Sequence, residues 1–332
     1  MAVVGQLYPT LVDLAKKQDP GGAIANVVEV LSKTNPILQD MAWKEGNLPT
    51  GHRITSRSAL PSVGWRRFNE GIAASKGSTE QVDETCGSLE GLSKVDTGLA
   101  ELSGNKAAFR ADEDNAFVQS FNIEVARSVF YESTKNSPER IHGLSPRMDS
   151  TLGNPAAAQI IKADATASGS DQASIWLIGW SPDSVFGIFP KGTKAGLESD
   201  DLGKQLVRDA AGKEYTAWVT SWKWRLGLCV RDFRYVVRIC NIDTSALTPD
   251  AATGANLVMS MQDAIAALQD MTSCNPVFYM NRTLFSAFNK QLMGKSSNFL
   301  EYVERGGRRV PHYLGVPITV VDALTNAESV VS

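Results

Sequence analysis

The sequence has few of the residues from which catalytic and metal-binding motifs are built. Among its 332 residues are only three histidines, His52, His142 and His312, and they lie in separate segments. They form neither a His-Glu-x-x-His nor a His-x-His pattern, and no Gly-x-Ser-x-Gly or Gly-x-Gly-x-x-Gly motif occurs. We therefore expect no catalytic residue, no cofactor and no metal ligand, and interpret each histidine as a surface or turn residue.

Cysteine is also scarce. The four cysteines lie 143, 11 and 34 residues apart, which matches no zinc-site spacing and no Cys-x-x-Cys motif. We expect buried free thiols, as is typical of a reducing compartment. Long apolar runs and a signal peptide are absent too: the longest run, 175–180, is far shorter than the ~20 residues of a membrane helix. We expect a soluble protein without a membrane partner.

Two near-matches to catalytic motifs fail on inspection. The segment Gly196 to Lys204 has six residues between its glycines, where a phosphate loop has four, and three acids that would repel phosphate. Asp232 and Asp243 flank a predicted strand and form a conceivable carboxylate pair. Aspartates at strand ends are far more often turn residues, which is the interpretation adopted, and an enzyme with an unrecognised site is the weaker alternative.

What the chain does have is enough apolar sequence for a substantial core. Its residues are 43% apolar and 21% charged, which is ordinary for a soluble globular protein. The length allows one large domain or two to three smaller ones. The formal net charge of −3 argues against a nucleic-acid binder, although a local basic patch stays possible.

Helical periodicity is clearest at the N-terminus and in one long central segment. Residues 3–33 read as two amphipathic pieces separated by a break at 19–22, forming a thin arm without a core of its own. Over 105–134, Phe117, Phe121, Val125 and Val129 recur every fourth residue. This spacing predicts a long one-sided helix lying across a sheet.

Between these segments, two extended legs of opposite charge predict a hairpin. The first, 51–69, holds four arginines and no acid, and the second, 79–102, holds six acids against one lysine. The hairpin has too little apolar surface for a core. Two interpretations stay open: a solvated ribbon whose legs neutralise each other, or a projecting arm whose charges also pair with neighbouring subunits. Exposed ion pairs are weak singly, about 0–1 kcal/mol each, but many copies would set register.

Strand signals fill the middle of the chain. Residues 140–172 are rich in loop-forming residues, and 191–214 are polar. The apolar runs 175–180 and 185–189 flank a Ser-Pro-Asp-Ser turn signal and predict a hairpin. Strands are expected over 215–241, where three tryptophans, Trp218, Trp222 and Trp224, are interpreted as packing residues. The basic run there faces another subunit, an anionic polymer or solvent: Arg225, Arg231, Arg234 and Arg238.

The last fifth of the chain predicts a surface and no chemistry. A helix over 253–270, starting at Thr253 or Gly254, precedes a short strand at 277–280. The strand leads into a second helix with one apolar face, which Leu284, Phe288 and Leu292 define. A polar loop at 304–309 and a final alternating strand from Val316 follow.

This order of elements resembles the major capsid proteins of tailed bacteriophages, the Hong Kong 97-type fold family. The resemblance is carried by TAWVTSWKWRLGLCVRDFRYVVRICNID, NPVFYMNRTLFSAF and LGVPITVVDAL, which together span about 216–324. These patterns are individually degenerate, and their order is what identifies the family. The match at 41–103 rests on architecture alone.

The resemblance implies an α+β fold with four parts. Residues 1–40 would be the N-terminal arm, 41–104 the E-loop that reaches over a neighbour, 105–250 the peripheral domain with a spine helix at about 105–134, and 251–332 the axial domain. The region 140–215 does not map onto the family's strand order, so a variant topology is expected. The loop 304–309 would face like copies around a five- or six-fold axis.

The implied function is structural. Subunits would self-assemble into pentamers and hexamers of an icosahedral shell that encloses double-stranded DNA without specific contacts. An arm of about 40 residues leaves no room for a fused scaffolding region, which implies either a separate scaffolding protein or unassisted assembly. The resemblance implies a scaffolding protein and a portal as partners, and leaves open whether a decoration protein is added. The chain would be made in the bacterial host cytoplasm and end in the virion. No covalent crosslink is predicted, and an encapsulin-type nanocompartment shell is the alternative.

Ten charged residues are the candidates for contacts between subunits. The hairpin and the 304–309 loop supply them: Arg53, Arg57, Arg66, Arg67, Glu80, Asp83, Glu84, Arg305, Arg308 and Arg309.

Overall fold

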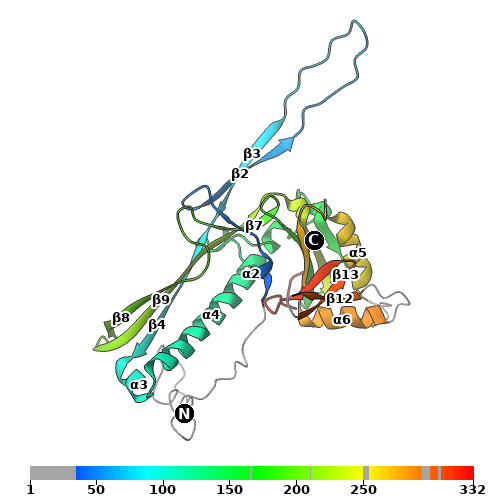
Figure 1. Cartoon of the computed structure of the whole chain (residues 1–332). Coiled ribbons are helices and arrows are strands. Elements are labelled where there is room, and N and C mark those ends of the chain that lie inside the picture. The colour runs from blue at the N-terminus through cyan, green and yellow to red at the C-terminus, as the bar shows by residue number, and fades with distance from the viewer. Residues whose placement is uncertain (1–34, 165–166, 210, 250–253, 294–299, 306–307) are drawn as a thin grey trace.

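A large mixed sheet forms the body of the molecule, and a two-stranded ribbon projects from it (Figure 1). The computed structural model describes residues 35–164, 167–209, 211–249, 254–293, 300–305 and 308–332. Within them, the large sheet has twelve strands in the order β12-β13-β14-β11-β6-β7-β9-β4, with β1, β5, β8 and β10 attached beside this path. Helices pack on both faces, so the expected α+β class is confirmed. The arm helices expected at 3–33 lie outside the described residues.

The strands alternate with helices along the chain. Their bounds are β1 Trp43–Glu45, β2 Gly51–Ala59, β3 Ser78–Thr85, β4 Gly87–Asp96, β5 Ile160–Lys162, β6 Gln172–Trp180, β7 Val185–Phe189, β8 Glu198–Arg208, β9 Glu214–Val230, β10 Val236–Asp243, β11 Asn275–Met280, β12 Leu300–Arg305, β13 Arg308–Tyr313 and β14 Val316–Val320. The helices are α2 Ile37–Asp40, α3 Thr97–Leu102, α4 Lys106–Tyr131, α5 Leu257–Ala267 and α6 Arg282–Met293, with short turns η1 Ser145–Arg147, η2 Ala157–Gln159 and η3 Phe233–Tyr235.

Strand β6 lies at the centre of the body and is buried on both faces. Its side chains alternate between two apolar clusters because successive residues of a strand point to opposite sides. Trp176, Ile178 and Trp180 join the cluster beneath the end of α4, whereas Ile175 and Leu177 join the cluster under α5 and α6. A strand covered on both faces explains its nearly continuous apolar sequence.

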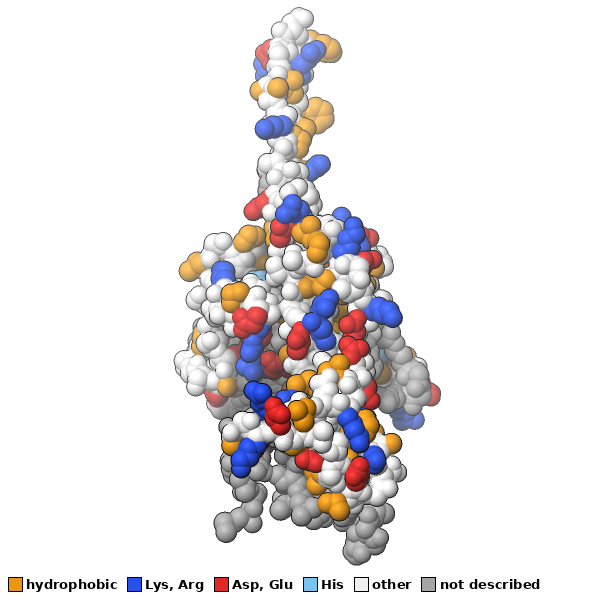
Figure 2. All heavy atoms as spheres, turned by 90° about the vertical axis from the view of Figure 1, so that its left-hand side faces the viewer, with side chains coloured by type: hydrophobic (Ala, Val, Ile, Leu, Met, Phe, Trp, Pro, Cys, Tyr) orange, Lys and Arg blue, Asp and Glu red, His pale blue; other side chains and the backbone are white. Residues whose placement is uncertain are grey.

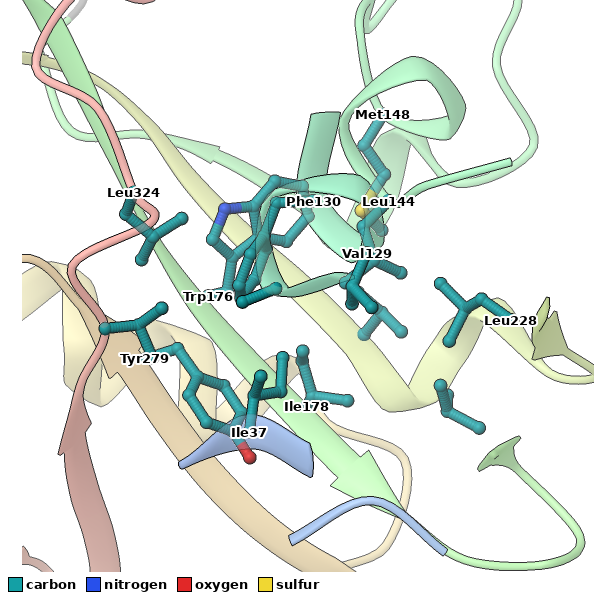
Figure 3. Close-up of a cluster of buried hydrophobic side chains, with 14 of the residues drawn as sticks. Ile37, Val129, Phe130, Leu144, Met148, Trp176, Ile178, Leu228, Tyr279 and Leu324 are labelled. Carbon is teal, nitrogen blue, oxygen red and sulfur yellow. The ribbon is translucent and has the colours of Figure 1, made fainter. Parts of the chain in front are cut away.

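The first of these clusters also fixes the start of the described chain. Ile37 of α2 is fully buried beside Tyr279 of β11 (Figure 3). The Tyr279 hydroxyl donates to Asp40 Oδ2 at 2.9 Å and accepts from Trp180 Nε1 at 2.8 Å. Burial raises the pKa of Tyr279 well above its ordinary value. The segment at 35–41 is therefore anchored in the core.

The predicted long helix is confirmed as α4. The Asn105 side chain caps it by accepting from the Ala108 N–H at 3.1 Å. It lies along the antiparallel ladder of β4, β9 and β8 (Figure 1). The approach is close at Gly91 of β4, where a Cβ would come within 3.2 Å of Phe117 and Phe121. Trp218 and Trp224 of β9 pack against apolar clusters, as expected.

The C-terminal elements agree with the sequence pattern in type. Helix α6 buries Leu284, Phe288 and Leu292 on one side, and β14 pairs in parallel with β11. Helix α5 starts later than predicted, because Asn256 is the residue that caps it. The predicted loop at 304–309 is shorter than expected: Glu304 and Arg305 belong to β12 and pair with Arg309 and Arg308 of β13, and residues 306–307 lie outside the described chain.

Three sequence-based expectations about strands are wrong. Strands β6 and β7 do not form a hairpin, because they meet in parallel only at Trp180 and Val185 and their main partners are other strands. The predicted second leg, 79–102, divides at Thr85: β3 pairs with β2, but β4 pairs with β9 and 97–102 is helical. The polar segment 191–214 contains β8, an edge strand paired only with β9 in the described chain.

Candidate functional site

The projecting hairpin is the feature with the clearest functional geometry. Strands β2 and β3 pair antiparallel from Gly51 opposite Thr85 to Ala59 opposite Ser78. Beyond them, residues 60–77 form a long tip that extends away from the body (Figure 1). Isolated two-stranded hairpins are marginally stable in water, so the ribbon needs support at its base.

A partly buried ion pair supplies that support. Arg147, beside α4, donates from Nη1 and Nη2 to the two carboxylate oxygens of Glu84 at 2.6 and 2.8 Å. The same guanidinium donates to the carbonyls of His142 and Gly143 at 2.9 and 3.1 Å. Bidentate pairing of this kind fixes orientation as well as distance. The base of the ribbon is therefore rigidly held to the body.

Apolar and steric contacts complete the base. Ile54 is buried in a small cluster with Phe186, Ile188 and Cys229. Gly51 lies so close to β3 that a Cβ would come within 2.0 Å of the Glu84 carbonyl oxygen. The side chain of Asn47 binds the outer edge of β2. Its Oδ1 accepts from the Arg53 N–H at 2.7 Å, and its Nδ2 donates to the Arg53 carbonyl at 2.8 Å. It thereby pairs backbone groups that a sheet edge leaves open.

The tip carries large apolar side chains in full contact with solvent. Val63, Trp65 and Phe68 are 93%, 106% and 94% exposed. Figure 2 shows hydrophobic and basic side chains side by side on this projection. The tip itself is loosely held: its described hydrogen bonds include Ser75 Oγ to the Ser62 carbonyl at 2.7 Å and the Glu70 N–H to the Arg67 carbonyl at 3.3 Å.

Six of the seven predicted charged residues of the hairpin divide into three groups. Arg53 pairs across the strands with Asp83 in two hydrogen bonds of 2.6 Å, and this contact lowers the pKa of Asp83. Arg57 and Glu80 lie near the outer end of the paired strands, and the side chain of Glu80 is exposed. Arg66 and Arg67 lie on the exposed tip.

Glu84 differs from the other candidates, because its side chain is only 5% exposed and is held by Arg147 within the chain. It supports the ribbon from within the chain. The remaining candidates lie in the β12–β13 hairpin. Arg305 and Arg308 are opposite each other in register, Arg309 is opposite Glu304, and Arg309 is exposed.

The basic run of β9 and β10 does not form one surface. Arg231 pairs with Asp183 at 2.8 Å and Arg234 with Asp232 at 2.7 Å, both near the molecular surface. Arg238 is buried and pairs with Glu328 at 2.8 Å. Sequence inspection missed this last pair, since no local pattern joins residues 90 positions apart.

The aspartates and cysteines considered as candidates for chemistry make structural contacts. Asp232 caps η3 by accepting from the Arg234 N–H, and Asp243 accepts from the N–H and Oγ of Ser245 in a turn. The four cysteines are free thiols, and burial raises the pKa of Cys229 to about 12 and of Cys86 to about 11. Among the described residues no group of three or more His, Cys, Asp or Glu is placed to hold a metal, and no described helix is long and apolar enough to cross a membrane.

Comparisons with known proteins agree with this geometry. The family model for the major capsid protein GP7 matches residues 19–332. A chain in the structure of bacteriophage Epsilon15 is 37% identical, with a TM-score of 0.78, over 100% of this chain and 99% of the other. The comparison with curated proteins gave no match.

One more distant structure shares the fold. The capsid of bacteriophage JBD30 is 9% identical, with a TM-score of 0.51, over 90% of this chain and 95% of that one. The SrpI encapsulin of Synechococcus elongatus PCC 7942 is 10% identical over 71% of this chain and 97% of that one, and its TM-score of 0.45 is too low to support the encapsulin alternative. The chain belongs to the GP7 family of major capsid proteins, which are structural proteins of the phage virion with the Hong Kong 97-type fold.

Proposed function

We propose that copies of this chain assemble into pentamers and hexamers of an icosahedral shell around double-stranded DNA, and that the β2–β3 hairpin links neighbouring subunits. The observation that carries the proposal is the tip, where large apolar side chains are exposed on a ribbon without a core. Apolar burial contributes roughly 25 cal/mol per Å², and contiguous exposed apolar groups mark interaction surfaces. The rigid base would position the tip for a neighbour.

The β12–β13 hairpin is the second proposed contact, around the five- or six-fold axes. Glu304 lies opposite Arg309 in register, so each hairpin presents both signs of charge. A ring of such hairpins would place acids of one copy near arginines of the next, including Arg305 and Arg308. Rim charges of this kind act on register and partner choice more than on affinity.

The remaining partners are proposed from the family resemblance. The proposed partners are a separate scaffolding protein, a portal and a decoration protein that binds the shell. The chain would be synthesised in the host cytoplasm. The chain would act by assembly and catalyse no reaction. With a net charge of −3, it would confine DNA without binding it specifically.

Charge reversal on the tip tests the hairpin's role. Arg66→Glu with Arg67→Glu should reduce particle yield at least tenfold in negative-stain microscopy and gradient sedimentation. The subunit should keep its circular dichroism spectrum and melting temperature, because both side chains lie outside the core. Lys191→Glu with Lys194→Glu makes the same charge change on another exposed segment and is the matched control. An unchanged particle yield for the tip variant refutes the proposal.

A further inference from the structure

Strand β8 is a long open edge of the large sheet. In the part of the chain that the structure describes it pairs only with β9, from Glu198 opposite Lys223 to Arg208 opposite Glu214. It lies at the outer margin of the β4–β9–β8 ladder, away from the β2–β3 ribbon (Figure 1). Its sequence contains no proline, so no position lacks a backbone N–H donor. An open edge of this length is a template for pairing with another strand.

The charges of β8 are segregated by sign. Residues 198–201 hold three acids and no base, and residues 204–208 hold two bases and no acid. Charge on an edge strand discourages most partners, but segregated charge is selective. A second β8 in parallel would place acid against acid, whereas an antiparallel one places the acidic half against the basic half. Leu202 and Leu206, which are 47% and 63% exposed, add apolar area to the same edge.

A β-bulge in the middle of β8 aligns its central charges. The register to β9 shifts between Asp201 and Gly203. As a result, Asp201 and Lys204 share the face toward α4, although residues three positions apart in a regular strand point to opposite faces. Asp201 pairs with Arg110 of α4 at 2.8 Å, and Lys204 lies over the Trp218 ring, which Arg110 also contacts. Both side chains are exposed, Asp201 by 56%.

Charge and face together select one register, because opposite residues of an antiparallel pair share a face. We propose that β8 pairs antiparallel with β8 of a second copy about a two-fold axis at residues 202–203. Asp201 of each copy then lies opposite Lys204 of the other, and the axis repeats this contact because a two-fold interface is self-complementary. Residues 198–207 take part, and the turn at 209–213 extends beyond them.

This pairing rests on the proposed function and adds a contact that involves neither hairpin. Exposed charge pairs and one stretch of backbone pairing are weak alone. The contact therefore forms where the other contacts of a shell already hold two copies close together, since linked contacts act at high effective concentration. Assembled particles are the state in which it is measured.

Disulfide formation at the axis tests the pairing. Residue 202 lies opposite residue 203 of the other copy, so two Leu202→Cys side chains are one position apart, within the ~4.4–6.8 Å between Cα atoms that a disulfide spans. Oxidised particles should give covalent dimers on non-reducing gels and no larger species, because a two-fold contact closes on itself. The matched control, Gln205→Cys on the same strand, should give none, since its copy lies about 17 Å away along the strand.

The parent chain, whose four thiols are partly or fully buried, should also give no dimers. Leu202→Cys particles without dimers overturn the pairing and leave shell assembly standing. Equal dimer yields from Leu202→Cys and Gln205→Cys overturn it as well, and so does a ladder of larger species, which would indicate a head-to-tail contact. If the parent chain forms no particles at all, the proposed function fails and the pairing fails with it.

Co-assembly of two charge variants tests the register. One chain carries Leu202→Cys with Lys204→Glu, and the other carries Leu202→Cys with Asp201→Lys. Two copies of the same variant place like charges across the axis, whereas one copy of each places opposite charges there. Mass spectrometry of the oxidised dimers should find mixed dimers at least fivefold more abundant than dimers of one variant, where random pairing gives equal amounts. Equal amounts overturn the proposed register.

Discussion

Arg238 and Glu328 form a buried ion pair that ties the C-terminal segment to the central sheet. Their charged atoms are 2.8 Å apart, and their side chains are 3% and 6% exposed. Arg238 also donates to the Met148 carbonyl at 2.7 Å and lies over the Trp176 ring. Tyr131 of α4 donates to the second oxygen of Glu328 at 2.7 Å. Helix α4, the sheet and the C-terminal segment thus share one polar network in the core.

Replacing Glu328 with Gln should destabilise the subunit strongly. A buried guanidinium without its counter-ion is costly, and breaking such pairs typically removes about 3–5 kcal/mol. We expect a loss of about 3 kcal/mol in the free energy of unfolding, measured by urea denaturation. The control is Asp183→Asn, which breaks the exposed pair with Arg231 and should cost less than about 1 kcal/mol. Equal losses in the two variants would show that burial does not decide the effect.

A methyl group at Gly51 should damage the base of the hairpin. Its Cβ would lie 2.0 Å from the Glu84 carbonyl oxygen, so β2 and β3 would have to separate. Overpacking of this kind costs about 1–3 kcal/mol, and we expect about 2 kcal/mol for Gly51→Ala by urea denaturation. Gly71→Ala is the control, because nothing lies within 4 Å of a Cβ there and its effect should be within about 0.5 kcal/mol. If the two variants unfold alike, the contact at Gly51 is relieved without cost.

Elements with strong local periodicity were predictable from the sequence. The helix α4 and the order strand, helix, strand at the C-terminus follow from apolar spacing, because each buries one continuous face. The opposite charges of the hairpin legs indicated cross-strand pairing in general, of which the Arg53–Asp83 pair is an instance that the sequence did not single out. For the tip, the sequence shows apolar residues interspersed with arginines. It does not show that the aromatic side chains are exposed to solvent.

Long-range pairing was not predictable. The turn signal between β6 and β7 does mark a turn. However, β10 and β11 pair antiparallel with the two edges of β6, so β7 does not form a hairpin with it. Strand β8 escaped detection because it is an exposed edge strand with polar side chains on both faces. The Arg238–Glu328 pair joins segments distant in sequence, and one arginine among four gives no sign that it is buried.

Mild acid should weaken the subunit through two histidines at the base of the hairpin. Burial lowers the pKa of both His52 and His142 from the ordinary 6.5, helped by Lys44 for the first and Arg147 for the second. Below about pH 6.5 the unfolded chain therefore binds more protons than the folded one, and the free energy of unfolding falls as pH decreases. The loss ends once pH is below the lowered, folded-state pKa values.

The measurement is the urea midpoint at pH 7.5 and pH 5.5. The parent chain should lose stability between the two, and a His52→Gln, His142→Gln variant should lose less, because the glutamines do not titrate. The single variants divide the effect between the two positions. An identical drop in parent and double variant would assign the acid sensitivity to other groups.

Trypsin should cut the free subunit first at the hairpin tip. Arg66 and Arg67 are exposed on a segment with few hydrogen bonds, which is where local opening is least costly. The two fragments should stay together, because β2 and β3 are held by the Glu84–Arg147 pair and the buried Ile54. Mass spectrometry of early digests identifies the site, and Arg66→Gln with Arg67→Gln should remove it.

The same digestion on assembled particles measures whether the tip is covered. If the tip is buried against a neighbour, cleavage after Arg66 and Arg67 should slow at least tenfold, because a protease needs a segment that is free to open. Cleavage at the exposed turn between β8 and β9, after Arg208 or Lys213, gives an internal reference for access of trypsin to the particle. A tip that is cut at the same rate in particles and free subunits would place it in solvent, and the hairpin would then contribute to assembly through its strands alone.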